Sequence, residues 1–184
     1  MIEWLRDKTR DNLSRDLRSL GLTTLLARRG RPEEKIERTR FQRSLGIIDI
    51  VSGGSIKWVN VLKKGGGENN PPQWRVVFGI PDERPIQQAV NIKTIRRKTF
   101  PLFGKVVDVA WQGNDGTTGL IDLLSSDEDV NVLAKGIGNL VICSHADDFR
   151  GWTLQVDRRL KPNSRNWATI QKVAKYLLSA RHDV

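Results

Sequence analysis

The spacing of hydrophobic residues changes near residue 45, and this change divides the chain into two regions. Before it, apolar side chains recur every three or four residues among many charged ones, which is the spacing of an amphipathic helix. After it, they alternate with polar residues, which is the spacing of a β-strand with one buried face. We therefore predict a charged helical extension over 1–44 and an α+β core domain over 45–184.

Two helices are predicted in the extension. In the first, Leu13, Leu17 and Leu20 follow the i, i+4, i+7 pattern. The second is predicted over 32–46, because Pro32 suits a first helical turn, where its missing N–H would have no partner anyway.

An amphipathic extension of this kind could dock on a protein complex or on an acidic membrane surface. Acidic residues among the arginines weaken the membrane interpretation and suit ion pairs along a helix. The predicted docking residues are Trp4, Leu5, Leu13, Leu17 and Leu20.

About six to eight strands are predicted in the core. The stretch "KGGGENNPP" is the strongest loop signal in the chain, and alternating segments flank it on both sides. Three hairpins are predicted, with strands over 55–63 and 73–81, 105–112 and 117–124, and 139–144 and 151–158.

Two helices are predicted among these strands. The first begins after Ser125 or Ser126, since each precedes an acidic residue by three positions and so forms a capping-box pattern. The second runs over about 164–180, with Asn163 or Ser164 as its N-cap. Strands joined mainly by hairpins favour an α+β fold whose mostly antiparallel sheet is packed by the C-terminal helix.

The composition narrows the range of partners. The 184 residues carry 31 basic and 21 acidic side chains, giving a net charge of +10 and an isoelectric point near 10.2. Such an excess favours an anionic partner, with nucleic acid the leading candidate. The single Cys143 allows no intrachain disulfide, so a reducing, cytoplasmic location is expected. The first residues lack the apolar run of a secretory signal, and no stretch is apolar enough for a transmembrane helix.

Basic residues cluster in short stretches, and these are the predicted anion-binding sites. No aromatic side chain lies inside any of them, so the sequence does not indicate base stacking. The alternative is a set of solvated cations that protect an edge strand from unwanted pairing. The predicted binding residues are Lys93, Arg96, Arg97, Lys98, Arg158, Arg159, Lys161 and Arg165.

Catalytic and metal-binding motifs are absent from the sequence. The stretch "CSHADDFRGW" could place His145 beside Asp147 and Asp148 in a small hydrolase, but it lies between two predicted strands and resembles a hairpin loop. We predict no catalytic residue, no cofactor and no metal ligand, since neither phosphate-loop nor zinc spacing occurs.

Three hypotheses follow. The favoured one is a non-enzymatic binding or assembly module whose basic surface contacts an anionic partner. The others are a scaffold subunit that docks through 1–44 and a small hydrolase around His145.

Overall fold

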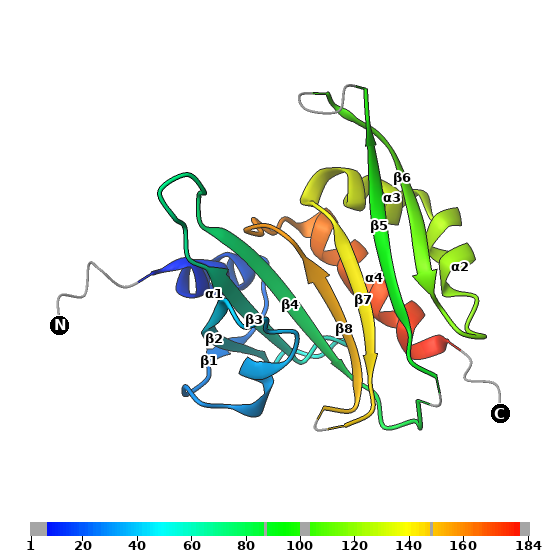
Figure 1. Cartoon of the computed structure of the whole chain (residues 1–184). Helices are drawn as coiled ribbons and strands as arrows, with labels where there is room; N and C mark the ends of the chain where they lie inside the picture. Colours follow the sequence, from blue (N-terminus) through cyan, green and yellow to red (C-terminus); the bar gives the residue numbers. More distant parts are fainter. Residues whose placement is uncertain (1–6, 87, 100–103, 148, 181–184) are drawn as a thin grey trace, which may run out of the picture.

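The computed structural model describes residues 7–86, 88–99, 104–147 and 149–180 (Figure 1). Eight strands among these residues form one antiparallel sheet in the order β1-β2-β3-β4-β8-β7-β5-β6. The strands are β1 (Thr24–Leu26), β2 (Gln42–Ile50), β3 (Trp58–Lys64), β4 (Gln73–Pro81), β5 (Asn91–Lys98), β6 (Val106–Asn114), β7 (Leu140–His145) and β8 (Gly151–Val156).

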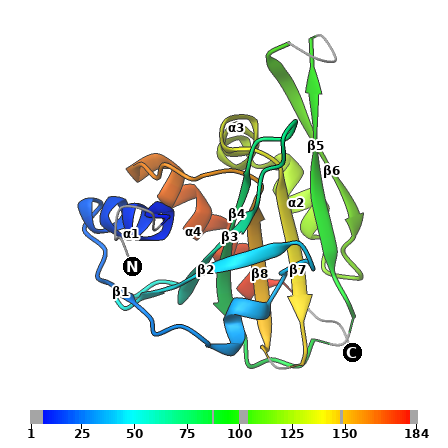
Figure 2. The same ribbon diagram turned by 60° about the vertical axis from the view of Figure 1, so that its left-hand side comes forward.

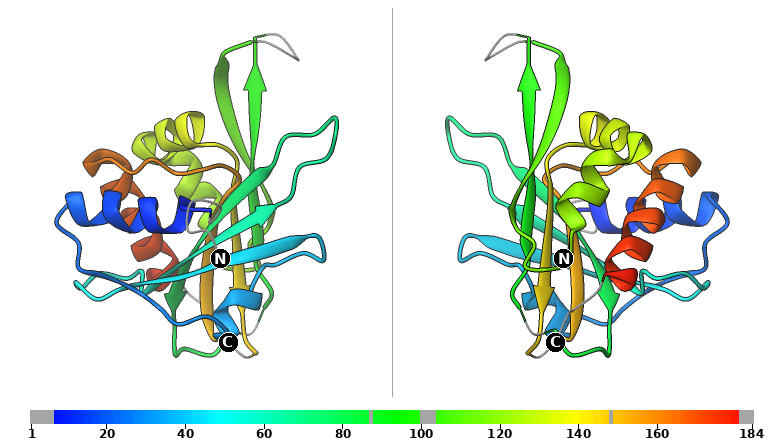
Figure 3. Two further views of the ribbon diagram at one scale, coloured as in Figure 1. Left: turned by 90° about the vertical axis from the view of Figure 1, so that its left-hand side faces the viewer. Right: turned by 90° about the vertical axis from the view of Figure 1, so that its right-hand side faces the viewer.

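Four α-helices in the described ranges lie together on one side of the sheet (Figure 3). They are α1 (Thr9–Ser19), α2 (Leu120–Ser126), α3 (Glu128–Ile137) and α4 (Ser164–Ser179). The predicted α+β fold, with a mostly antiparallel sheet packed by a C-terminal helix, is confirmed. The opposite face of the sheet, which we call the open face, carries no α-helix in the described ranges, and the short 3-10 helix η2 (Pro32–Lys35) lies on it.

The main core lies between the sheet and the helices. Alternation along β4 turns Val76, Phe78 and Ile80 toward the helices, where all three are buried. Trp167 and Ile170 of α4 belong to the same cluster, and Trp167 meets Phe78 edge to face. Burying each such side chain contributes about 1.5–3 kcal/mol relative to leaving it in water.

A smaller apolar cluster lies on the open face, formed by Ile47, Trp58, Leu62 and Val77. Trp58 packs flat against Gly79 of the neighbouring strand, where a Cβ atom would lie only 1.9 Å from the indole. The sheet therefore buries part of both faces.

The first predicted helix is present as α1. Leu13 and Leu17 are buried in the main core, and Leu20 packs against its margin. Docking of a partner through Leu13 or Leu17 would require α1 to leave its own sheet. Trp4 and Leu5 lie outside the described residues.

The helix predicted over 32–46 is wrong. Only η2 forms, and β2 begins at Gln42, so the predicted domain boundary after residue 44 falls within a strand. Ser44 and Ile47 pair with β3 and face the open side, where Ile47 is completely buried. Cross-strand pairing and burial outweigh the local preference for helix, which is a weak determinant by itself.

The strand predicted over 117–124 is also wrong, because α2 occupies most of it and β6 pairs with β5 instead. Leu120 and Leu124 stand one helical turn apart and are both buried. The Asp115 carboxylate accepts a hydrogen bond from the Ile121 amide at 3.1 Å, which satisfies a free donor at the start of α2. The α3 cap is Asp127, whose Oδ1 accepts from the Val130 amide, and not Ser125 or Ser126.

The other two predicted hairpins are confirmed as β3–β4 and β7–β8, and α4 begins after Asn163 as predicted. Hairpins β3–β4 and β5–β6 both extend beyond the rest of the sheet at the same end (Figures 1 and 2). We call this the hairpin end. It is the end at which β2 and β4 begin and at which β3 and β5 finish.

Candidate nucleic-acid interface

Strand register places basic side chains on the open face at the hairpin end. Arg75 of β4 is opposite Leu62 of β3, a member of the open-face cluster, so Arg75 shares that face. Lys93 of β5 belongs to the cross-strand row that runs through Val141 and Gln155 to Val77 of the same cluster.

Alternation extends this face in both directions. Lys64 lies two residues beyond Leu62 on β3, and Arg97 lies four residues beyond Lys93 on β5. Lys64, Arg75, Lys93 and Arg97 therefore share the open face. They are contributed by three different strands.

These four cations form no ion pair with any described carboxylate. Asp108 is opposite Arg97 in the β5–β6 register, yet no ion pair joins them. Arg75 Nη1 donates to Gln155 Oε1 at 3.2 Å, which positions the guanidinium without neutralising it.

A cavity of about 240 Å³ opens between Arg75 and Lys93. The carboxylate in its wall is Asp157, which accepts hydrogen bonds from the Asn139 amide at 2.8 Å and from Asn139 Nδ2 at 2.6 Å. The cavity is therefore lined by two cations and one carboxylate, which leaves a net positive charge. The remaining lining residues are Thr94, Val141 and Gln155.

Three of the predicted arginines lie at the same end but away from the open face. Arg96 alternates with Lys93 and Arg97, and its Nη2 donates to the Lys135 carbonyl at the end of α3 at 2.6 Å. Burial, and then the nearby Arg158, lower the pKa of Arg96 below its usual value. The guanidinium of Arg159 lies 3.6 Å from the centre of the Trp74 ring.

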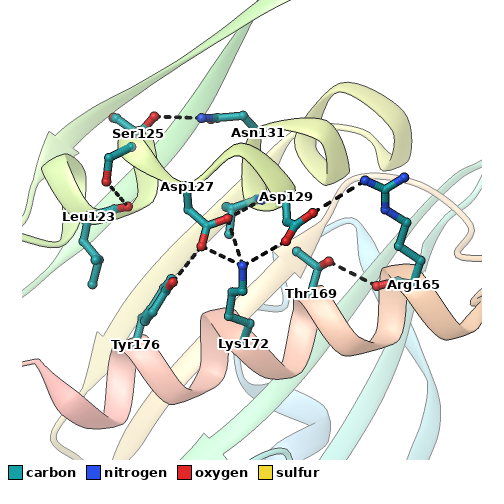
Figure 4. Close-up of polar contacts among 11 residues, drawn as sticks. Leu123, Ser125, Asp127, Asp129, Asn131, Arg165, Thr169, Lys172 and Tyr176 are labelled. Carbon is teal, nitrogen blue, oxygen red and sulfur yellow. Dashed lines mark hydrogen bonds and ion pairs between the residues drawn. The ribbon is translucent and has the colours of Figure 1, made fainter.

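The other predicted basic residues have different surroundings. Lys98 is exposed at the end of β5, and Lys161 is exposed in the connection between β8 and α4. Arg165 pairs with Asp129 at 3.5 Å, in the network of polar contacts that joins α3 to α4 (Figure 4). Of the eight predicted residues, Arg165 alone forms an ion pair with a described carboxylate.

Six of the eight predicted cations, Lys93, Arg96, Arg97, Lys98, Arg158 and Arg159, thus lie at one end of the sheet but not on one face. Sequence reasoning missed Lys64 and Arg75, which lie outside the predicted binding residues; Lys64 follows Lys63, and Arg75 has no basic neighbour in the sequence. The signal available was their alternation with the buried residues Leu62 and Val77, but strand order was needed to bring them beside Lys93.

His145 takes a different partner from those predicted. Its Nε2 lies 3.2 Å from Glu37 Oε1 and 2.9 Å from Thr153 Oγ1. The hydrogen bond from His145 lowers the pKa of Glu37 below its usual value, although burial opposes this. Asp147 is exposed and forms no hydrogen bond or ion pair with His145, while Asp148 lies outside the described residues.

The thiol in the cluster around His145 is not an activated nucleophile. Cys143 points to the same face two residues earlier, but burial, and then the charge of Glu37, raise the pKa of its thiol to about 12. A thiol that stays protonated at neutral pH is a poor nucleophile. The ion pair between Glu37 and His145 instead connects the segment before β2 to the end of β7.

Within the described ranges, no three histidine, cysteine or acidic side chains are grouped as metal ligands would be. None of the helices in those ranges combines the length and apolar character needed to cross a bilayer. No protein-family model, curated protein or solved structure matches this chain.

Proposed function

We propose that this protein binds nucleic acid through the hairpin end of its sheet. The observation that carries the proposal is the convergence of Lys64, Arg75, Lys93 and Arg97 on the open face without carboxylate partners. Among the described residues, no ion pair competes with a ligand for the charge of these four side chains. Cations left free on one surface are available to phosphates, which dominate the affinity of nucleic-acid binding.

The shape of this end supports the same proposal. The two hairpins rise on either side of the end of β8 (Figure 1). Lys98 is the last residue of β5 and so belongs to the β5–β6 hairpin. Arg96, Arg158 and Arg159 lie at the same end on the helix side and add to its positive potential. A cytoplasmic location, expected from the lone cysteine, would give such a surface access to nucleic acid.

The test is fluorescence anisotropy with labelled 20-nucleotide DNA and RNA, single-stranded and duplex, across a series of salt concentrations. A triple variant, Arg75→Ala, Lys93→Ala and Arg97→Ala, removes three open-face cations. Each lost phosphate contact reduces the slope of log K against log salt by about 1, so we expect a slope smaller by about 3. Affinity at low salt is expected to fall at least about tenfold.

A matched variant controls for net charge. Lys57, Arg150 and Lys175 are exposed, lie away from the hairpin end and form no ion pair with a described carboxylate. Replacing these three by alanine makes the same change in net charge and should leave affinity within about twofold. Equal losses in both triple variants, or no binding by the unmodified protein at low salt, would refute the proposal.

A further inference from the structure

The same end of the molecule carries an exposed aromatic ring. Phe41 is 73% exposed, more than any other large hydrophobic residue in the described part of the chain. It stands directly before β2, whose first residue, Gln42, pairs with Lys64. Phe41 therefore lies at the hairpin end, beside the first of the four open-face cations.

A tight turn holds this ring outward. The Gln42 amide donates to the Thr39 carbonyl at 3.0 Å, and the Thr39 amide donates to Gln42 Oε1 at 3.2 Å. Arg40 and Phe41 occupy the two central positions of this turn, where side chains project away from the sheet. Upstream, Ile36 packs on the open-face cluster and Glu37 is bound to His145, so the turn has a fixed base.

Two hollows flank the ring. One, of about 640 Å³, is lined by Phe41 together with Lys64 and the glycines that follow it. The other, of about 570 Å³, is lined by Phe41 together with Arg40 and Arg43. Gly65 and Gly66 line both hollows, and the absence of side chains there allows a ligand to approach the backbone closely.

The charges around the ring have one sign. Neither hollow is lined by an aspartate or a glutamate, and Glu68 of the same loop lines neither of them. Lys63, in the wall of the second hollow, is neutralised by Asp7 at 2.6 Å. Arg40, Arg43 and Lys64 form no ion pair with a described carboxylate, and Arg40 lies 6.0 Å from the centre of the Phe41 ring.

We infer that Phe41 stacks with an unpaired base of single-stranded nucleic acid whose phosphates contact Arg40, Arg43 and Lys64. This inference rests on the proposed function. A flat apolar ring surrounded by unpaired cations matches the alternation of base and phosphate in one strand. The bases of a duplex are already stacked on one another, so their faces cannot reach the ring.

The surroundings distinguish this surface from one that docks an apolar protein partner. The walls of both hollows are mostly charged, amide or glycine residues, and Phe41 is the aromatic residue among them. From β2 to β5 the hairpin end spans five strand spacings, or about 24 Å. One strand could therefore run from Phe41 past Lys64 and Arg75 to Lys93.

The test compares Phe41→Ala, Phe41→Leu and Phe41→Trp with the unmodified protein. The probes are labelled oligo(dT) and oligo(U) 20-mers, a 20-base-pair duplex and an abasic 20-mer that keeps the phosphates. Stacking of one base predicts about 5- to 150-fold weaker binding of the oligo(dT) or oligo(U) strand by Phe41→Ala and Phe41→Leu. Phe41→Trp should retain binding, and its fluorescence should be quenched by oligo(dT) but not by the abasic strand.

Other readouts separate stacking from charge and from folding. Phe41→Ala removes no charge, so the salt slope and the affinity for duplex should not change. Because the side chain is 73% exposed, the free energy of unfolding should change by less than about 0.5 kcal/mol. Oligo(dT) and oligo(U) together determine whether the strand is DNA, RNA or either.

The outcomes distinguish the two proposals. If the unmodified protein binds single strands but Phe41→Ala or Phe41→Leu binds them equally well, stacking is refuted and the proposed function stands. Equal binding of the abasic and oligo(dT) strands would also refute stacking. If no probe binds at low salt, both proposals fail, and a protein partner becomes the alternative for this surface.

Discussion

Asp127 connects α3 to α4, and its removal should weaken the whole fold. Its Oδ1 caps α3 by accepting from the Val130 amide at 3.1 Å. Its Oδ2 accepts from Tyr176 Oη at 2.6 Å and from Lys172 Nζ at 2.9 Å, both on α4 (Figure 4). One carboxylate thus accepts from a free backbone amide at the start of α3 and also joins α3 to α4.

The magnitude follows from these contacts. Loss of an N-cap costs about 1 kcal/mol, and loss of a hydrogen bond to a charged group costs about 1.5 kcal/mol or more. We therefore expect Asp127→Ala to lower the free energy of unfolding by about 2–3 kcal/mol. Asparagine is itself a good N-cap, so Asp127→Asn should lose only the charge-dependent part, about 1–2 kcal/mol.

The pH dependence provides an independent check. Burial alone would raise the pKa of Asp127, but hydrogen bonds from Tyr176, Lys172 and the Val130 amide outweigh it and lower the pKa from 3.8 to about 2. A lowered pKa in the folded state means that the ionised carboxylate stabilises the fold. This stabilisation is present above pH 4 and is lost as the pH falls toward 2. Asp127→Asn should lack this component.

Urea unfolding followed by tryptophan fluorescence measures these changes, with thermal unfolding as a second probe. A loss of 2–3 kcal/mol corresponds to about 5–10 °C in a chain of this length. Glu68→Ala is the control, because it removes the same charge from an exposed loop residue that forms no ion pair with the described residues. If Asp127→Ala is as stable as Glu68→Ala, the assigned role of the α3–α4 contact is refuted.

Three further predictions concern the core and the thiol. Leu17 is completely buried, so Leu17→Ala should lower the free energy of unfolding in urea by about 2–5 kcal/mol. Leu25 is 57% exposed, so Leu25→Ala should lower it by less than about 0.5 kcal/mol. Equal effects of the two substitutions would contradict the packing of α1. Gly79→Ala should cost about 1–3 kcal/mol or more, since the added methyl group meets the Trp58 indole, and an unchanged unfolding midpoint would contradict that close packing. Iodoacetamide at pH 8 should alkylate Cys143 at least about tenfold more slowly in the folded protein than in urea, and equal rates would show that the thiol is accessible and ionisable.

The sequence identified many of the basic residues of the candidate interface, but it did not show on which face of the sheet each one lies. The basic stretch over 93–98 was recognised because its residues are adjacent, and it does lie at the hairpin end. Alternation within β5, however, sends Arg96 to the helix side while Lys93 and Arg97 face the other way. Adjacency in a strand therefore does not mean a shared surface.

The role of Phe41 as an exposed aromatic ring beside these cations could not be predicted in the same way. Phe41 stands far in sequence from 93–98, and the pattern around it predicted a helix. Its exposure depends on the turn at Thr39 and on the pairing of β2 with β3, neither of which is encoded in local spacing. The sequence therefore did not indicate base stacking.

The sequence by itself determined two hairpins and the C-terminal helix. The β3–β4 and β7–β8 hairpins follow from alternation on both sides of a turn, and α4 follows from an Asn163 cap before an apolar stripe. Distinct turn or capping residues mark these elements in the sequence, so local residue patterns are enough to specify them.

Tertiary structure alone decided the rest. The α+β class could be predicted, but the pairings of β4 with β8 and of β7 with β5 join segments that lie tens of residues apart, and the burial of both faces favours them. Pairing of β2 with β3 makes residues 42–46 a strand, and the packing of the segment before β2 on the sheet places Glu37 beside His145. Long-range pairing and burial overrode local propensity at these positions, because each is worth more free energy than the preference of a few residues for helix.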